Sequence, residues 1–169
     1  MNLKKIICWP PLLGGIGAGV AIAILAYITF KSFLSGSYYG LWLATSFGST
    51  VVVVFGYHNS EFAQPKNVLL GHLLCALVGI IFVVLFKITQ DRSIFFLAIG
   101  LAVGLSVMLM MAFKITHPPA GGNTIVVMLA QDSFQYLIFP IMAGAITIII
   151  VGIIYNRLIL KRNYPLKWL

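Results

Sequence analysis

The sequence predicts an all-α, polytopic membrane protein with four full spans and two short re-entrant or broken helices. Charged residues make up 8% of the 169 residues, whereas a soluble domain carries roughly 25%. Hydrophobic residue types make up 61% of the chain, and the mean hydropathy is +1.06. Four long apolar runs complete the pattern. This composition argues against a soluble enzyme, a secreted disulfide scaffold, a disordered tail and a nucleic-acid binder.

The four full spans are predicted from runs that contain no Asp, Glu, Lys or Arg. They cover residues 12–30, 68–86, 94–113 and 134–155, and each approaches the roughly 20 residues that cross a bilayer. Uninterrupted runs of this length exclude a membrane β-barrel, whose strands alternate with a period of two. We treat residues 1–169 as one integral membrane domain.

Two further apolar segments are too irregular or too short to be ordinary spans. Residues 38–57 are long enough, but the polar run 45–50 is expected to interrupt them. Residues 120–130 number about 11, which as a helix is roughly half of a bilayer core. His117-Pro118-Pro119 precedes them, and proline starts a helix more readily than it continues one.

The two short segments resemble each other. Residues 48–55 align without a gap with residues 122–129, at an offset of 74. The order of long span, broken helix and long span therefore occurs twice, and we predict an internal repeat over about 12–87 and 94–155. Paired short or glycine-interrupted segments in two halves indicate the binding site of a transporter.

The 11 Lys and Arg residues outnumber the 3 acids and give a net charge of +8. Two topologies divide the basic residues 8 to 3 between the two sides. With four spans, Lys66 and Lys114 lie opposite the termini. With six crossings they join the termini, and Lys87 and Arg92 move away. The positive-inside rule predicts cytoplasmic termini in both, and the shortness of 120–130 favours the four-span, re-entrant arrangement.

Small residues at a four-residue spacing predict close packing of helices. The sets are Gly15, Gly19 and Ala23; Gly71, Cys75 and Gly79; and Gly100 with Gly104. We expect packing within the monomer, with a homo-oligomer as the alternative use of these faces.

A helix that begins inside the membrane leaves its first N–H groups without partners, and these groups suit an anion or a polar solute. We predict such starts at 48–50 and 121–124, which meet near the midplane. His117 either contacts the solute or braces the turn, whereas a structural role is the better interpretation of His72. The candidate substrate-binding residues are His117, Pro118, Pro119, Gly121, Gly122, Asn123, Thr124, Gly48, Ser49, Thr50 and His72.

The sequence predicts neither an enzyme nor a cofactor or metal site. Glu61, Asp91 and Asp132 fall in predicted loops, so no pair of carboxylates lies in the membrane. The His and Cys residues lack the close spacing of a zinc motif. Because the spans contain no acid, any proton coupling must use a histidine.

The residues 117–121, His-Pro-Pro-Ala-Gly, resemble the signature of the HPP family of integral membrane proteins. Three further blocks resemble that family in the same order: residues 46–49, residues 63–67 with the Gly-His pair 71–72, and the tail 162–168. The resemblance implies four transmembrane spans and, since some members are assigned nitrite transport, a small-anion transporter. Lys66 stands where Arg is more usual, which weakens a bidentate anion contact there.

We therefore expect a permease or channel for a small monovalent anion, with nitrite the first candidate. A neutral polar-solute pore is one alternative, and a non-transporting membrane scaffold or subunit is another. No signal or transit peptide is evident at the start of the sequence. We expect the inner (plasma) membrane, with the lipid bilayer and the anion as partners and no nucleic acid.

Overall fold

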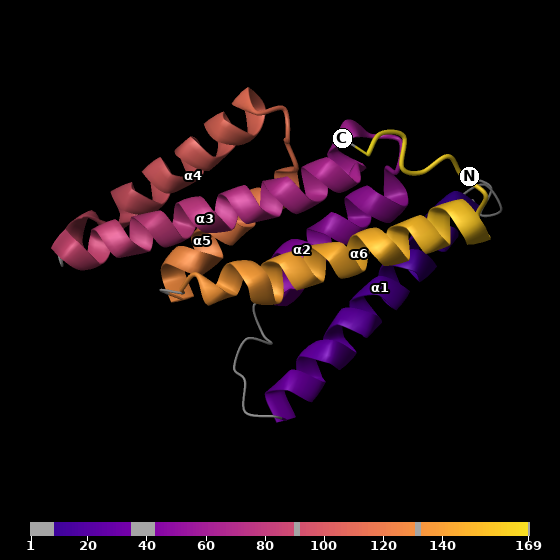
Figure 1. Cartoon of the computed structure of the whole chain (residues 1–169), viewed down its shortest axis with the longest axis horizontal. Helices are drawn as coiled ribbons and strands as arrows, with labels where there is room; N and C mark the ends of the chain where they lie inside the picture. Colours follow the sequence, from indigo (N-terminus) through magenta and orange to yellow (C-terminus); the bar gives the residue numbers. More distant parts are fainter. Residues whose placement is uncertain (1–8, 35–42, 90–91, 131–132, 169) are drawn as a thin grey trace, which may run out of the picture.

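The computed structural model describes residues 9–34, 43–89, 92–130 and 133–168 (Figure 1). These residues form helices and connecting segments, with no strand among them. The α-helices are α1 (Trp9–Leu34), α2 (Leu43–Val51), α3 (Pro65–Thr89), α4 (Phe95–Ala112), α5 (Gly121–Ala130) and α6 (Ala143–Ile153). Short 3-10 or π-helical turns flank them: η2 (Val52–Gly56), η3 (Glu61–Ala63), η4 (Arg92–Ile94), η5 (Pro118–Ala120), η6 (Leu137–Met142) and η7 (Ile154–Ile159).

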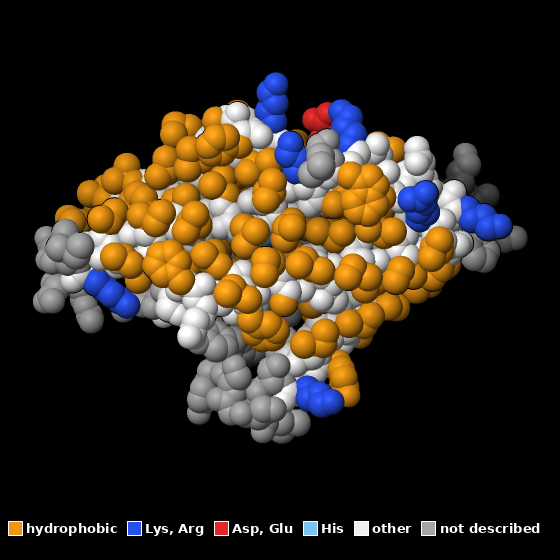
Figure 2. Space-filling model, viewed as in Figure 1, with side chains coloured by type: hydrophobic (Ala, Val, Ile, Leu, Met, Phe, Trp, Pro, Cys, Tyr) orange, Lys and Arg blue, Asp and Glu red, His pale blue; other side chains and the backbone are white. Residues whose placement is uncertain are grey.

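Four helices of the described chain are long and apolar enough to cross a membrane. They cover Pro11–Lys31, Pro65–Lys87, Phe95–Ala112 and Leu137–Ile159. The prediction of a helical, multi-pass membrane protein is confirmed, and its environment is a lipid bilayer. Hydrophobic side chains cover most of the face seen in Figure 2, with Lys and Arg mainly toward its margins.

The fourth span begins three residues later than predicted. Helix η6 starts at Leu137, and Phe139 within it has extended dihedral angles (φ −136, ψ 118). Pro140 follows Phe139 and has no N–H to donate to the preceding turn, so the helix is irregular at this point. The regular helix α6 begins only at Ala143.

The predicted interruption at residues 45–50 is wrong, because α2 runs through it. Thr50 donates its hydroxyl hydrogen toward the carbonyl oxygen of Ser46, one turn earlier, at 3.0 Å. This bond satisfies the polar side chain within the helix, so it does not compete with the helical backbone. Helix α2 passes into the π-helical turn η2. Residues 38–42 of the predicted segment lie outside the described residues.

The second short segment is confirmed almost to the residue. The turn η5 covers Pro118–Ala120, and α5 continues from Gly121 to Ala130. Four long helices and two short ones thus follow one another in the order long, short, long, long, short, long, which the predicted repeat requires. We call residues 9–89 the first half and residues 92–159 the second half. The repeat itself stays a prediction.

The chain returns to its starting end at Tyr57, contrary to the favoured four-span arrangement. One hollow is lined by Pro11 near the start of α1, by Tyr57 and by Arg162 of the C-terminal tail. Another pocket is lined by Lys66, Lys114 and Lys167 together. Four spans would place Lys66 and Lys114 opposite the tail. The structure therefore places Lys66 and Lys114 at the end of the molecule that carries the tail, as the six-crossing arrangement predicts. Whether the short helices α2 and α5 cross the bilayer stays a prediction.

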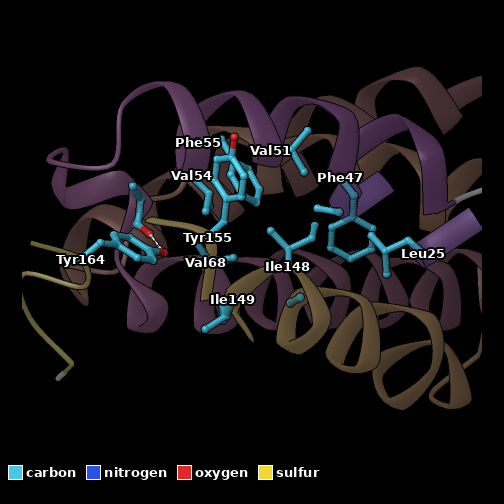
Figure 3. Packing of buried hydrophobic residues seen from close by; sticks show 13 residues of the cluster. Leu25, Phe47, Val51, Val54, Phe55, Val68, Ile148, Ile149, Tyr155 and Tyr164 are labelled. Atoms are coloured by element: carbon cyan, nitrogen blue, oxygen red, sulfur yellow. Dashed lines mark hydrogen bonds between the residues drawn. The ribbon is translucent and has the colours of Figure 1, made fainter. Parts of the chain in front are cut away.

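The hydrophobic core has two main parts. One joins α1, α2, η2 and α6 around side chains such as Phe47, Phe55, Ile148 and Tyr155 (Figure 3). The other joins α3, α4 and α5 around Ile80, Val127 and Met128, with Tyr136 beside them. The polar cluster described below lies where α2 of the first part meets α3 and α5 of the second.

The small-residue face of α3 packs within the monomer, as predicted. A Cβ at Gly79 would lie 3.0 Å from the carbonyl oxygen of Thr124 on α5. The corresponding faces of α1 and α4 are open, because a Cβ at Gly15, Gly19, Gly100 or Gly104 would meet nothing within 4 Å. Those faces are available to lipid or to another chain, and the homo-oligomer stays a prediction.

Candidate functional site

Four polar side chains lie fully buried where α2, α3, η5 and α5 meet. They are Thr50, His72, His117 and Asn123, and each has 0% of its surface exposed. Buried polar groups are costly unless they find hydrogen-bond partners. We call these four residues the His-Thr-His-Asn cluster.

Thr50 is the centre of this cluster. Its Oγ1 lies 2.8 Å from Nε2 of His72 and 3.1 Å from Nε2 of His117. The outer nitrogens of the two imidazoles have different partners. Nδ1 of His117 lies 2.7 Å from the carbonyl oxygen of Phe62, and Nδ1 of His72 lies 2.7 Å from Nδ2 of Asn123. The cluster is therefore a continuous hydrogen-bonded chain.

Gly71 makes this arrangement possible, because it lets the segment before α5 approach α3. A Cβ at this position would lie 2.9 Å from Cβ of His117 and 3.2 Å from the carbonyl oxygen of Ile115. The rings of His72 and His117 consequently lie 5.0 Å apart between centroids. Phe47 of α2 covers His72 from the other side, with ring centroids 4.8 Å apart.

The cluster is polar but carries no acid, Lys or Arg. His117 lies in the connection before η5, outside the four spans. Burial lowers the pKa of His117 to about 4, and the hydrogen bond to Phe62 opposes this shift. The imidazole of His117 is therefore neutral at pH 7 in the described conformation, so a net positive charge does not hold a solute there.

Asn123 has one atom without a partner. Its Nδ2 contacts His72, but its Oδ1 is buried and has no hydrogen-bond partner in the structure. An unsatisfied buried oxygen costs about 1–3 kcal/mol. Such an atom needs an explanation, and a bound donor is one of the standard explanations.

The turn that leads into α5, up to Gly121, does not present the free amides that the sequence suggested. Pro118 and Pro119 have no N–H, the N–H of Ala120 bonds to the carbonyl oxygen of His117 at 2.9 Å, and the N–H of Gly121 is also bonded within the turn. The other predicted helix start, at 48–50, is wrong, because α2 begins at Leu43. The contacts of the His-Thr-His-Asn cluster are made by side chains and by the carbonyl oxygen of Phe62.

The predicted site residues separate into two groups. His72, His117, Thr50 and Asn123 come together as described. Thr124 is buried nearby, but its hydroxyl donates to the carbonyl oxygen of Cys75 and lies 2.8 Å from Ser106. The remaining candidates do not join the chain of hydrogen bonds: Ser49 and Pro118 are exposed, and Pro119, Gly48, Gly121 and Gly122 are half-buried.

Two participants were not anticipated from the sequence. The first is the backbone carbonyl oxygen of Phe62, a residue whose side chain is exposed. A sequence carries no signal for a backbone acceptor of this kind. Ser106 did carry a signal, since it is a lone hydroxyl within the apolar run 94–113. It is fully buried in α4 and joins Thr124.

A surface pocket of about 230 Å³ lies at the end of the molecule that carries the C-terminal tail. It is lined by Glu61, Gln64, Lys66, Asn67, Lys114 and Lys167. Asn67 donates to the carbonyl oxygen of Thr116, the residue before His117, at 2.9 Å. One residue of the pocket lining is therefore hydrogen-bonded to the residue that precedes His117 of the cluster.

The third histidine, His58, is apart from the cluster. It lies in the connection after η2, where partial burial and the positive charge of Arg162 lower its pKa. Among the described residues, no group of three or more His, Cys, Asp or Glu side chains is arranged to hold a metal ion.

The fold and the site define a polytopic helical membrane protein with a polar cluster buried between its two halves. The chain belongs to the HPP transmembrane family, which it matches over residues 5–165. It is 33% identical over 151 residues to a transmembrane protein of Dictyostelium discoideum, covering 87% of this chain and 52% of that protein. A second Dictyostelium transmembrane protein is 30% identical over 153 residues, or 88% and 48% of the respective chains.

The chain thus spans about half the length of these curated relatives. No solved structure matches it significantly.

Proposed function

We propose that this protein is a transporter of a small polar solute rather than an enzyme, with a monovalent anion as the solute and nitrite as the first candidate. The supporting observation is the His-Thr-His-Asn cluster, which draws Thr50 and His72 from the first half and His117 and Asn123 from the second. Binding sites at the contact between two halves, beside broken helices, are typical of secondary transporters.

The burial of the site limits the kind of solute that it can bind. All four side chains of the cluster are fully buried, and so is the unpartnered Oδ1 of Asn123. A solute there exchanges its hydration shell for hydroxyl, imidazole and amide groups, so it must be small and able to hydrogen-bond. Nitrite, nitrate and formate meet both conditions.

The test is uptake by proteoliposomes that contain the purified protein. We expect faster nitrite uptake than in protein-free vesicles, and we expect His117→Ala and Thr50→Val to abolish the difference. Thr147→Val is the matched control, because Thr147 also donates to a carbonyl one turn earlier, that of Ala143, at 2.8 Å. Vesicles without protein measure the leak of nitrous acid through the lipid.

If nitrite, nitrate and formate all enter no faster than in empty vesicles between pH 5 and 8, anion transport is wrong. Osmotic swelling in a neutral solute, without anion uptake, would identify the neutral-solute pore instead. That alternative has its own support, since the free Oδ1 of Asn123 accepts a hydrogen bond from a neutral donor. The cell inner membrane and cytoplasmic termini remain part of the proposal.

A further inference from the structure

An apolar groove begins at the surface pocket that the three lysines line. We call that pocket, with its lining of Glu61, Gln64, Lys66, Asn67, Lys114 and Lys167, the lysine pocket. Lys66 also lines a second hollow of about 530 Å³, and the other side chains around that hollow are apolar. We call it the leucine groove, because α3 contributes Leu70, Leu73, Leu74 and Leu77 to its lining. The two hollows therefore meet at Lys66.

The leucine groove follows one stripe of α3 into the membrane. Its four leucines follow Lys66 at the spacing i+4, i+7, i+8 and i+11, which places them on one helix face. Lys66 is the second residue of the span Pro65–Lys87 and so lies at the membrane interface. Leu77 lies about 16 Å further along the helix axis. Since the hydrocarbon core is about 30 Å thick, the groove reaches through about one leaflet.

The groove is open to the surrounding lipid. Phe113, which follows α4, and Leu137, at the start of η6, line it together with α3. Phe113 has 61% of its surface exposed, and Leu70 has 39% exposed. At this depth the exposed surface meets acyl chains rather than water, so an acyl chain reaches the groove without crossing the protein.

The lysine pocket carries two positive charges that the protein does not offset. Nζ of Lys167 lies 3.8 Å from Oε1 of Glu61, so these two charges offset each other. Glu61 is the only acid among the described residues that line the pocket. The ammonium groups of Lys66 and Lys114 are therefore left to attract an anion. In Figure 2, several Lys or Arg side chains lie beside an acidic one at the upper margin of the molecule, with hydrophobic surface below them.

Hydrogen bonds to the C-terminal tail build one wall of the lysine pocket. The hydroxyl of Tyr164 donates to the carbonyl oxygen of Ala63 at 2.8 Å. Oε1 of Gln64 accepts from the backbone N–H groups of Leu166 at 2.8 Å and of Lys167 at 3.3 Å. These bonds hold the tail against the residues that precede α3, and they bring the tail to the rim of the pocket.

We propose that the lysine pocket and the leucine groove together bind one anionic phospholipid. Its phosphate lies against Lys66 and Lys114, and one acyl chain lies along the leucines of α3. Basic pockets between transmembrane helices bind anionic lipid headgroups, and lysine binds a phosphate as a point charge. A small soluble anion would use the pocket but not the groove, and a zwitterionic lipid has no net charge to match the two lysines. This site does not depend on the solute that the protein transports.

The test is native mass spectrometry of the whole protein, with phosphatidylglycerol or phosphatidylcholine of the same acyl chains added in detergent. One lysine near the membrane surface strengthens the binding of an anionic lipid about fivefold. We therefore expect the first phosphatidylglycerol to bind roughly twentyfold more tightly than phosphatidylcholine. Lys66→Gln and Lys114→Gln should each weaken phosphatidylglycerol binding about fivefold. Lys87→Gln is the matched control, because Lys87 lies in the last turn of α3 and lines neither hollow.

The groove is tested by a variant of its own. Leu70→Gln places an amide in the groove and should weaken phosphatidylglycerol binding about fivefold, because part of the apolar contact is lost. Leu101→Gln is its control, since Leu101 of α4 is 66% exposed and lines neither hollow. Glycerophosphoglycerol, which is the same headgroup without acyl chains, should not displace the bound lipid.

Three results would overturn the proposal. The first is equal affinity of the parent protein for the two lipids, or unchanged phosphatidylglycerol binding in a variant that lacks both Lys66 and Lys114. The second is displacement of the lipid by glycerophosphoglycerol, which would make the pocket a site for a free phosphate ester. The third is a mass of two chains without bound lipid, which would show that a second copy covers the groove. None of these results depends on nitrite uptake, so the proposed function is tested separately.

Discussion

Oγ1 of Thr50 lies 3.1 Å from Nε2 of His117, and this contact joins α2 to the segment that begins α5. The same oxygen lies 2.8 Å from Nε2 of His72 on α3. One hydroxyl group thus connects three segments that are distant in the sequence. The side chains that make these bonds have no exposed surface, and the bonds depend on the close approach of the backbone at Gly71.

Gly71→Ala should destabilise the protein by about 1–3 kcal/mol, because the added methyl group meets buried atoms that cannot move aside. Its Cβ would lie 2.9 Å from Cβ of His117 and 3.2 Å from the backbone oxygen of Ile115. Denaturant unfolding in detergent measures the change. Gly100→Ala is the matched control, since its Cβ meets nothing within 4 Å. Equal stability of the two variants would contradict the packing described here.

Cysteine labelling should place Lys66 and Lys114 on the same side of the membrane as Lys167, because the three side chains line one pocket. In vesicles of uniform orientation and a Cys8→Ser background, an impermeant thiol reagent should modify Lys66→Cys, Lys114→Cys and Lys167→Cys from one side. Modification of Lys66→Cys and Lys114→Cys from the side opposite Lys167→Cys would restore the four-span arrangement. The buried Cys75 should react slowly in every case.

Much of the fold could be predicted because the bilayer imposes it. Runs of about 20 apolar residues specify spans whatever surrounds them, and the prolines at 118 and 119 specify the start of α5. The sides of the membrane could not be predicted in the same way. Between the two topologies Lys66 and Lys114 change sides in one direction, and Lys87 and Arg92 change sides in the other. The number of basic residues on each side is therefore the same in both, and the positive-inside rule does not distinguish them.

The site was predictable in its residue types but not in its geometry. A histidine next to two prolines and a second histidine early in a span drew attention to His117 and His72. Their contact depends on the close approach of the backbone at Gly71 and on the carbonyl oxygen of Phe62, which is distant in the sequence. Both are features of the tertiary structure. The expectation of free helix-start amides failed for a local reason: at η5, proline removes two donors and the 3-10 turn uses the N–H groups of Ala120 and Gly121.

The stability of the protein should fall with pH below about 6.5. Burial lowers the pKa of His117 to about 4 in the folded protein, whereas the unfolded chain titrates near 6.5. The unfolded state therefore binds the proton first, so stability is complete above pH 6.5 and declines as the pH falls toward 4. Denaturant unfolding between pH 4 and pH 7.5, without added anion, measures this decline.

His117→Asn should reduce this pH dependence, because the amide can still donate to Phe62 but does not titrate. His58 contributes to the slope in the same direction, since its pKa is also lowered, so the comparison is made in a His58→Asn background. A slope that is unchanged by His117→Asn would show that other groups cause it.

Lys114→Gly should stabilise the protein by about 1 kcal/mol. Lys114 lies two residues after the end of α4 in a left-handed conformation, with φ 55, and the N–H of Ile115 donates to the carbonyl oxygen of Met110 at 2.9 Å. Glycine adopts this conformation without the strain that a Cβ introduces. Lys114→Val should be destabilising at the same position, and thermal unfolding in detergent compares the two. A Gly variant less stable than the Val variant would refute this account.

Four hydrogen bonds in and around the cluster join the two halves of the chain. Thr50 to His117, His72 to Asn123, Asn67 to Thr116 and Thr124 to Cys75 all join a residue of the first half to one of the second. Sliding one half past the other would break these bonds. If the proposed solute replaces some of these bonds when it binds, the barrier to that motion is lower in the loaded protein than in the empty one. Exchange of labelled for unlabelled solute should therefore be faster than net flux.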